Sequence, residues 1–204
     1  MHVEVLVEEP SAEAALQALL PRLLGEASWE IRPFTGKTAL LKELPTRLRA
    51  YPDWLPHAYG EAWCVVVLVD RDDDDCLALK AELEQIAAEA GLVTRSVNPE
   101  AYRAVTRIAT EELEAWFFGD VPALHAAYPS VPVTLAARRG FRDPDAMTHT
   151  WERLEKMLDR VYPAGMPKVE VARTVAPLMN PNANRSRSFE VFRDTLLELN
   201  SRST

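Results

Sequence analysis

The chain has 204 residues, of which 48% are hydrophobic, and a formal net charge of −8 at pH 7. This length suffices for one sizeable core, and the acidic balance argues against a protein coated for nonspecific nucleic-acid binding, although a metal-dependent nuclease would also collect acids. No stretch approaches the ~18 apolar residues of a membrane span, and the amino terminus lacks a cationic signal region, so we expect a cytoplasmic protein without a membrane partner.

The first third of the chain alternates strand and helix signals. Residues 3–7 alternate apolar and acidic side chains, which predicts a short strand. Ser11 is a plausible N-cap for a helix that ends at Gly25, because leucines and alanines recur there at helical spacing. Residues 29–34 form the second expected strand, and residues 37–51 a second helix. Pro45 predicts a kink or break in that helix.

The middle of the chain continues this alternation. Residues 62–69 are apolar without interruption, which indicates a strand covered on both faces, as in parallel sheets. A long helix follows over residues 74–90 and is closed by Gly91. Residues 92–97 and 105–109 predict two more strands. The order of elements predicts an α/β fold with right-handed crossovers and a mostly parallel sheet.

The pattern changes after residue 110, where no further strong strand signal is found. We therefore expect one domain with an α/β core over about residues 1–120 and a helical part over about residues 121–204. A polar connection rich in Pro and Arg interrupts the helical part. The helices expected there cover residues 111–118, 121–128, 151–161, 168–179 and 189–199. Both cysteines, Cys64 and Cys76, are interpreted as buried thiols in a reducing compartment.

Carboxylates crowd the end of the apolar strand. Asp70 and Asp72 stand two residues apart where open α/β sheets place their ligands, at the carboxyl ends of strands. Such a pair repels itself unless a cation lies between, and hard divalent cations prefer oxygen ligands. We therefore predict Mg²⁺ or Mn²⁺ at Asp70 and Asp72. The neighbouring acids, residues 73–75, are interpreted as caps of the following helix.

Glu8 ends the first expected strand just as Asp70 ends the third. In a parallel sheet both side chains can reach one edge, so Glu8, Asp70 and Asp72 predict a pocket of three carboxylates. A strand-end Glu followed by a later Asp-x-Asp resembles the Toprim domain of topoisomerases, primases and OLD-type nucleases, and this resemblance implies that the three acids serve both catalysis and metal binding. The sequence LVEEPSAEAAL, at residues 6–16, is similar to that family's first motif, with Glu9 in place of the usual Gly. OLD-type members carry a second acid here, for which Glu13 is one residue late.

A third acidic group lies in TEELEAWFFGD, after the last expected strand. This segment resembles the acid-x-Trp pattern of RloB-like Toprim proteins, which implies Glu112 and Glu114 as further metal ligands. Spacing leaves the choice open, because Glu111 and Glu114 share a face in a helix whereas Glu112 and Glu114 share one in an extended segment.

Basic residues supply candidates for phosphate contacts. OLD-like domains place a lysine after their last acidic motif, and the resemblance implies that Lys168 meets the scissile phosphate. Lys37, at a helix start within GKT, could bind a phosphate, although the glycine spacing of a nucleotide-binding P-loop is incomplete. Arg185 and Arg187 could contact a nucleic-acid backbone. Other basic groups are Arg47 with Arg49, and Arg138 with Arg139 and Arg142.

Three stretches are distinctive: GKTALLKELPTRLRAY at residues 36–51, RIATEELEAWFFGD at residues 107–120 and NRSRSF at residues 184–189. With them, nearly the whole chain resembles the bacterial domain-of-unknown-function family 4276, which is placed among Toprim-like proteins. The resemblance implies a Toprim-like (Rossmann-like) sheet flanked by helices, with a C-terminal helical extension. It also implies a Mg²⁺- or Mn²⁺-dependent phosphoryl-transfer enzyme, most simply a nuclease with a DNA or RNA substrate, a partner ATPase in anti-phage defence or DNA processing, and an oligomer as an open possibility. The alternatives are a noncatalytic Toprim-like binding module and a phosphatase of the haloacid-dehalogenase type, in which Asp70 would be the nucleophile.

Overall fold

The computed structural model describes residues 1–202. Its centre is a parallel sheet of four strands in the order β2-β1-β3-β4, which confirms the predicted α/β class. The two central strands are buried along their whole length, whereas the edge strand β2 is largely exposed or half-buried. The strands are β1 (His2–Val7), β2 (Ser28–Pro33), β3 (Trp63–Asp70) and β4 (Ala104–Ala109).

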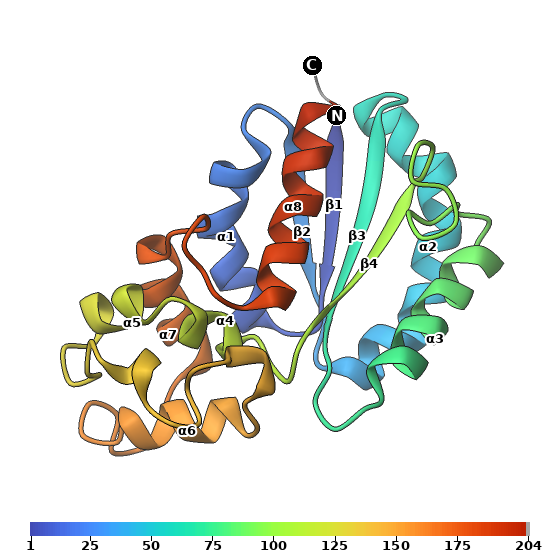
Figure 1. Ribbon diagram of the computed structural model, residues 1–204. Coiled ribbons are helices and arrows are strands. Elements are labelled where there is room, and N and C mark those ends of the chain that lie inside the picture. The colour runs from blue at the N-terminus through green and yellow to red at the C-terminus, as the bar shows by residue number, and fades with distance from the viewer. Residues whose placement is uncertain (203–204) are drawn as a thin grey trace.

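Helices cover both faces of the sheet, as Figure 1 shows. One face packs against α1 (Pro10–Leu24) and α8 (Arg187–Ser201), and the other against α2 (Lys37–Tyr59) and α3 (Cys76–Glu89). The apolar run of β3 therefore meets leucines on both sides, which is why it shows no alternation of polar residues.

Four short helices gather beyond the carboxyl ends of the strands, at the bottom of Figure 1. Their apolar side chains join the core between the sheet and α1, so the C-terminal part of the chain packs into the same core as the strands. None of the helices in residues 1–202 is long and apolar enough to cross a bilayer. The four helices are α4 (Glu114–Gly119), α5 (Val121–Ala127), α6 (Thr150–Met157) and α7 (Lys168–Val175).

One expected strand is absent, and the second expected helix is longer than predicted. Residues 92–97 do not form a strand, since only an isolated bridge joins Thr94 to Ala104. Val93 and Val97 are exposed there, so the apolar pattern marks no buried face. The second helix does not break at Pro45 but continues to Tyr59, because its buried leucines stay on one face against the sheet and packing outweighs the lost hydrogen bonds.

The helix caps also differ in part from expectation. Ser11 lies inside α1, where its hydroxyl donates to Glu9 Oε1 at 2.6 Å, and Glu9 is the N-cap. Asp75 accepts from the backbone N–H of Ala78 and caps α3, in the role expected of this acid. The next residue, Cys76, is exposed rather than buried, since it opens the helix on its solvent side.

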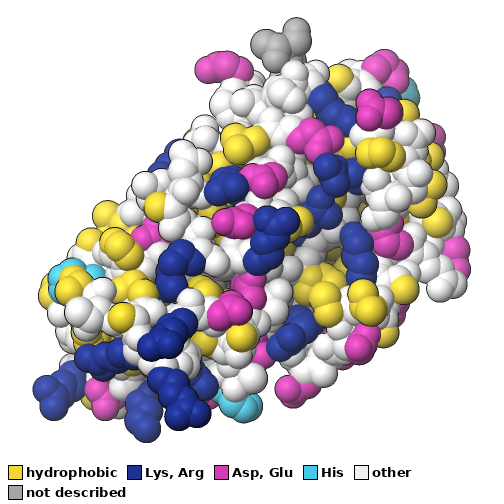
Figure 2. All heavy atoms as spheres, viewed as in Figure 1, with side chains coloured by type: hydrophobic (Ala, Val, Ile, Leu, Met, Phe, Trp, Pro, Cys, Tyr) yellow, Lys and Arg dark blue, Asp and Glu magenta, His cyan; other side chains and the backbone are white. Residues whose placement is uncertain are grey.

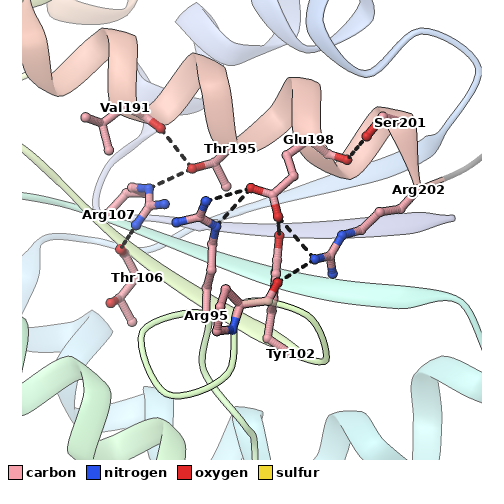
Figure 3. A network of polar contacts seen from close by, with 10 residues as sticks. Arg95, Tyr102, Thr106, Arg107, Val191, Thr195, Glu198, Ser201 and Arg202 are labelled. Atoms are coloured by element: carbon pink, nitrogen blue, oxygen red, sulfur yellow. Dashed lines mark hydrogen bonds and ion pairs between the residues drawn. The ribbon is translucent and has the colours of Figure 1, made fainter.

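A polar network fastens α8 to the edge strand β4 (Figure 3). The Glu198 carboxylate accepts from Arg95 Nη2 at 2.8 Å, from Tyr102 Oη at 2.8 Å and from Arg202 Nη2 at 3.1 Å. Arg107, on β4, donates through Nε to Thr195 Oγ1 at 2.8 Å. These contacts hold α8 against β4 and against the segment that precedes it.

Candidate functional site

The carboxyl ends of the central strands bring acidic residues together. Glu8 follows β1, and Asp70 is the last residue of β3. The backbone N–H of Asp70 donates to Glu8 Oε2 at 3.2 Å, so the first and third strands do deliver these two side chains to one edge. We call Glu8, Asp70, Asp72 and Glu114 the carboxylate edge.

Asp70 and Glu114 are the buried members of the carboxylate edge. Asp70 is 8% exposed, and burial raises its pKa well above the ordinary value, with further repulsion from Glu114 and Glu8. Glu114, in the first turn of α4, is 2% exposed; burial raises its pKa to about 7 against the attraction of Lys168. Its Oε2 atom is buried without a hydrogen-bond partner in residues 1–202. Burying such a group without compensation is costly, so the site favours a proton or a cation here.

Lys168, on α7, lies beside the buried carboxylate of Glu114. It opens α7, and its Nζ lies 3.3 Å from Glu9 Oε1 and 4.9 Å from the centre of the Trp151 ring. Burial lowers the pKa of Lys168, but the nearby carboxylates of Glu114 and Glu9 outweigh burial and raise it. The ammonium group is therefore charged and held beside the acids.

Lys37 pairs with acids at the exposed end of the carboxylate edge. Its Nζ lies 2.7 Å from Asp72 Oδ2, 2.7 Å from Asp74 Oδ2 and 3.1 Å from the carbonyl oxygen of Arg71. The Asp72 side chain is 48% exposed, so Asp72 lies on the solvent side of Asp70. The backbone of Asp72 has φ 50°, and its N–H donates to the carbonyl of Glu111 at 2.8 Å.

Glu111 and Glu112 are tied to the connection before α6. Glu111 accepts from Arg71 Nη2 at 2.7 Å and from the backbone N–H of His149 at 2.7 Å. Glu112 accepts from Thr150 Oγ1 at 2.9 Å and from the N–H of Trp151 at 2.8 Å. Both carboxylates therefore already serve as hydrogen-bond acceptors within the protein, in contrast to Glu114.

The backbone beside these acids is unusual. Asp72, Glu111 and His149 are non-glycine residues with positive φ, and they line one polar pocket together with Glu112. Such conformations cost of order 1–3 kcal/mol each and concentrate at functional sites. The sequence did not predict the positive φ of His149, because no glycine stands at this turn.

Three further candidates make their hydrogen bonds and ion pairs outside the carboxylate edge. Arg185 donates to the carbonyls of Phe118 and Arg142, at 3.2 and 2.8 Å. Arg187 is exposed and pairs with Glu190 at 3.0 Å, at the start of α8, whose N-cap is Ser186. Glu13, in the first turn of α1, lines a separate pocket.

The sequence did not predict two contacts of Lys168. Glu9, which stands in place of the usual Toprim glycine, accepts through its carboxylate from both Lys168 and Ser11. Trp151 lies under the ammonium group of Lys168, on a helix for which the sequence indicated only amphipathic character. A tryptophan at the start of a polar helix, after a connection rich in arginine, was the available signal.

The carboxylate edge offers the donors that a hard divalent cation prefers. All its side chains are carboxylates, and Glu114 Oε2 is a buried oxygen in need of a partner. Within residues 1–202, no three or more His, Cys, Asp or Glu side chains lie together in an arrangement that could hold a metal ion. Lys37 holds Asp72 in its present position, so the donor chemistry fits a cation whereas closure around it requires side-chain movement.

Comparison with known proteins gives one family and one structure. The family model described as "Domain of unknown function (DUF4276)" matches residues 7–197. The fold is similar to the C-terminal region of the Burkholderia pseudomallei OLD protein, with 21% sequence identity, a TM-score of 0.46, and coverage of 95% of this chain and 98% of that chain. No curated protein matches the chain.

Proposed function

Because this chain belongs to the DUF4276 family, whose description assigns no activity, we propose its function from the carboxylate edge. The proposal is metal-dependent phosphoryl transfer of the Toprim type, with a phosphodiester of DNA or RNA as substrate. The resemblance to Toprim proteins that work beside ATPases makes an ATPase partner and a role in bacterial defence part of the same proposal.

One observation carries the proposal. Glu114 Oε2 is buried without a partner, beside the buried carboxylate of Asp70 and the ammonium group of Lys168. A purely structural role would leave such an oxygen hydrogen-bonded, because an unsatisfied buried polar atom destabilises the fold. Acids that repel one another at the end of a parallel sheet are explained if a cation and a phosphate complete the site.

Glu8, Asp70, Asp72 and Glu114 would hold Mg²⁺ or Mn²⁺. A cation bound by these carboxylates supplies an acidified water and stabilises negative charge on a phosphoryl oxygen. Glu111 and Glu112 would act differently, because their carboxylates hold the connection that positions α6.

Lys168 and Lys37 would stabilise the negative charge of the phosphate groups of the substrate. Lys168 would lie against a phosphate oxygen and neutralise the charge that develops during transfer. Glu9 and the Trp151 ring would position its ammonium group from two sides. Lys37, at the first residue of the long helix α2, would exchange Asp72 for a second phosphate oxygen.

The test is paired substitution of Asp70→Asn and Asp72→Asn. We expect Mn²⁺-dependent nicking of supercoiled DNA to be lost while the protein stays folded, because Asn removes charge and leaves the size of each side chain unchanged. Thermal unfolding followed by circular dichroism checks the fold, and plasmid electrophoresis measures cleavage.

The matched control is Asp53→Asn with Asp159→Asn, two exposed acids outside the site that change the net charge equally. The control should cleave like the wild type. Cleavage that persists in the Asp70 and Asp72 variant would refute the assignment of residues. Absence of cleavage of DNA and RNA by the wild type, with any divalent metal and with or without an ATPase partner, would refute the nuclease.

A further inference from the structure

A cluster of arginines lies beside the carboxylate edge and has no role in the chemistry proposed above. Figure 2 shows Lys and Arg side chains gathered at the lower left of the molecule, over the region of the short helices. We call five of the arginines of this region the arginine cluster. Its members are Arg138, Arg139, Arg142, Arg153 and Arg185.

The members come from three segments and meet at one loop, residues 137–142. Arg142 Nε donates to the carbonyl of Ala137 at 3.2 Å, and Arg153 Nη1, from α6, donates to the carbonyl of Gly140 at 3.2 Å. Arg185, which precedes α8, donates to the carbonyl of Arg142 at 2.8 Å. The fold thus joins two basic groups that are 43 residues apart in the chain.

The charge of the arginine cluster is not neutralised internally. The hydrogen bonds of its members go to backbone carbonyls. No carboxylate of residues 1–202 forms an ion pair with any member, whereas the nearby Arg187 pairs with Glu190. The acids of the neighbouring loop are otherwise engaged: Asp143 accepts from the N–H of Asp145, and Asp145 accepts from Ser186 and Ser188. Guanidinium groups held together in this way repel one another, and a bound polyanion would relieve that repulsion.

Helix α4 connects the arginine cluster to the carboxylate edge. Glu114 opens the helix at the edge, and the carbonyl of Phe118 accepts from Arg185 Nη2 at 3.2 Å. Four helical residues separate these positions by only ~6 Å along the helix axis. Residues 143–148 connect the loop of the cluster to His149, whose N–H donates to Glu111. A polyanion on the cluster would therefore reach the acids of the edge.

We propose that the arginine cluster binds the phosphodiester backbone of a nucleic acid and guides the strand onto the carboxylate edge. The delivery of the strand to the carboxylate edge rests on the proposed function. Binding at the arginine cluster requires no cleavage. Arginine forms forked hydrogen bonds that match phosphate oxygens, and its contacts to phosphates fix register without reading bases. Binding at the arginine cluster is therefore independent of base sequence and strongly dependent on salt.

The experiment measures binding of a fluorescent single-stranded DNA to the full chain by anisotropy, in EDTA, over a series of salt concentrations. The variant is Arg138→Gln with Arg139→Gln and Arg142→Gln, three exposed positions. Affinity should fall about tenfold or more at low salt, and the slope of log K against log salt should decrease by ~2, as for three lost phosphate contacts on a single strand.

The matched control is Arg22→Gln with Lys42→Gln and Arg49→Gln, exposed positions on α1 and α2 that remove the same charge. The control should keep both the affinity and the salt slope much closer to the wild type. The proposal is overturned if the two triple variants bind alike, if the wild type does not bind DNA, or if polyglutamate binds as tightly as DNA at equal ionic strength.

These experiments distinguish a failure of the proposed DNA binding from a failure of the proposed cleavage. EDTA removes any contribution of hydrolysis to the anisotropy signal. Hydrolysis of bis(p-nitrophenyl) phosphate with Mn²⁺, a diester too small to span both sites, tests the carboxylate edge without the arginine cluster. A protein that binds DNA through the cluster but hydrolyses neither substrate would refute the proposed enzyme and leave the binding surface standing.

Discussion

At the scale of single residues, the main feature is the contrast among neighbouring acids. Glu112 has a hydroxyl and a backbone N–H as partners, whereas Glu114, two residues later, is buried with a free oxygen. Asp72 is exposed and paired with Lys37, whereas Asp70 is buried. Residue type is the same within each pair, so the difference in chemistry comes from burial and partners alone.

Glu114 makes the stability of the metal-free protein depend on pH. Its pKa is raised from 4.5 to about 7, so the folded state binds more protons than the unfolded state within that window. The free energy of unfolding in EDTA should therefore fall as pH rises from about 4.5 to about 7, by up to ~1.4 kcal/mol for each unit of raised pKa. Urea denaturation at several pH values measures it.

Glu114→Gln should remove this component of the pH dependence and increase stability at neutral pH, because the variant carries no buried charge. The same variant should lose Mn²⁺-dependent cleavage. Glu61→Gln, at an exposed position, is the control and should follow the wild-type pH curve. An unchanged slope in the Glu114 variant would show that the buried carboxylate is already compensated.

At the scale of elements, the start of each short helix positions the site. Helix α7 begins at Lys168 and α4 at Glu114, so both side chains lie at helix ends that face the sheet edge. Helix α6 begins after His149, whose φ is 54°, and Glu112 accepts from the hydroxyl of Thr150 and the N–H of Trp151 in its first turn. Glu112 is thus assigned to holding α6, and through α6 to holding Trp151 under Lys168.

Glu112→Ala tests this assignment at the level of the helix. Loss of the acceptor for Thr150 and Trp151 should lower the free energy of unfolding by ~1–2 kcal/mol, as for a lost helix cap, while cleavage persists. Thermal unfolding and plasmid nicking are measured on the same preparation. Glu112→Gln, which keeps an acceptor oxygen, should recover part of the stability. Loss of cleavage at unchanged stability would instead make Glu112 a metal ligand.

At the scale of the whole molecule, the C-terminal helix closes the fold. Helix α8 packs against α1 and against the edge strand β4. Its Glu198 accepts from Arg95 and Tyr102, in the segment before β4, and from Arg202 (Figure 3). Burial raises the pKa of Glu198, but hydrogen bonds from Arg95 and Tyr102 outweigh it and leave the pKa below its ordinary value. Glu198 therefore stabilises the protein above its ordinary pKa, and this contribution is lost as pH falls through the lowered pKa.

Glu198→Gln should loosen α8 from β4. Replacing a charged acceptor that serves Arg95, Tyr102 and Arg202 should cost ~1–3 kcal/mol and increase amide hydrogen exchange in both elements. Glu190→Gln, on the same helix, removes only an exposed pair with Arg187 and should cost less than ~0.5 kcal/mol. Equal costs for the two variants would contradict a structural role for the network.

The sequence alone determined the strands, their parallel arrangement and the meeting of Glu8 with Asp70. Apolar runs and strand ends are local patterns, and parallel strands must present their carboxyl ends at one edge. The expected strand at residues 92–97 failed because an apolar pattern does not say whether a partner strand is available.

Only the tertiary structure decided which acids are buried and which cations face them. Lys168 and Glu9 lie 159 residues apart, and the arginine cluster joins segments from three parts of the chain. Such convergence depends on how distant helices pack on the shared core, which no local period encodes. Burial in turn sets the cost of a charge, so the same residue type becomes a cap at Glu112 and an unsatisfied buried acid at Glu114.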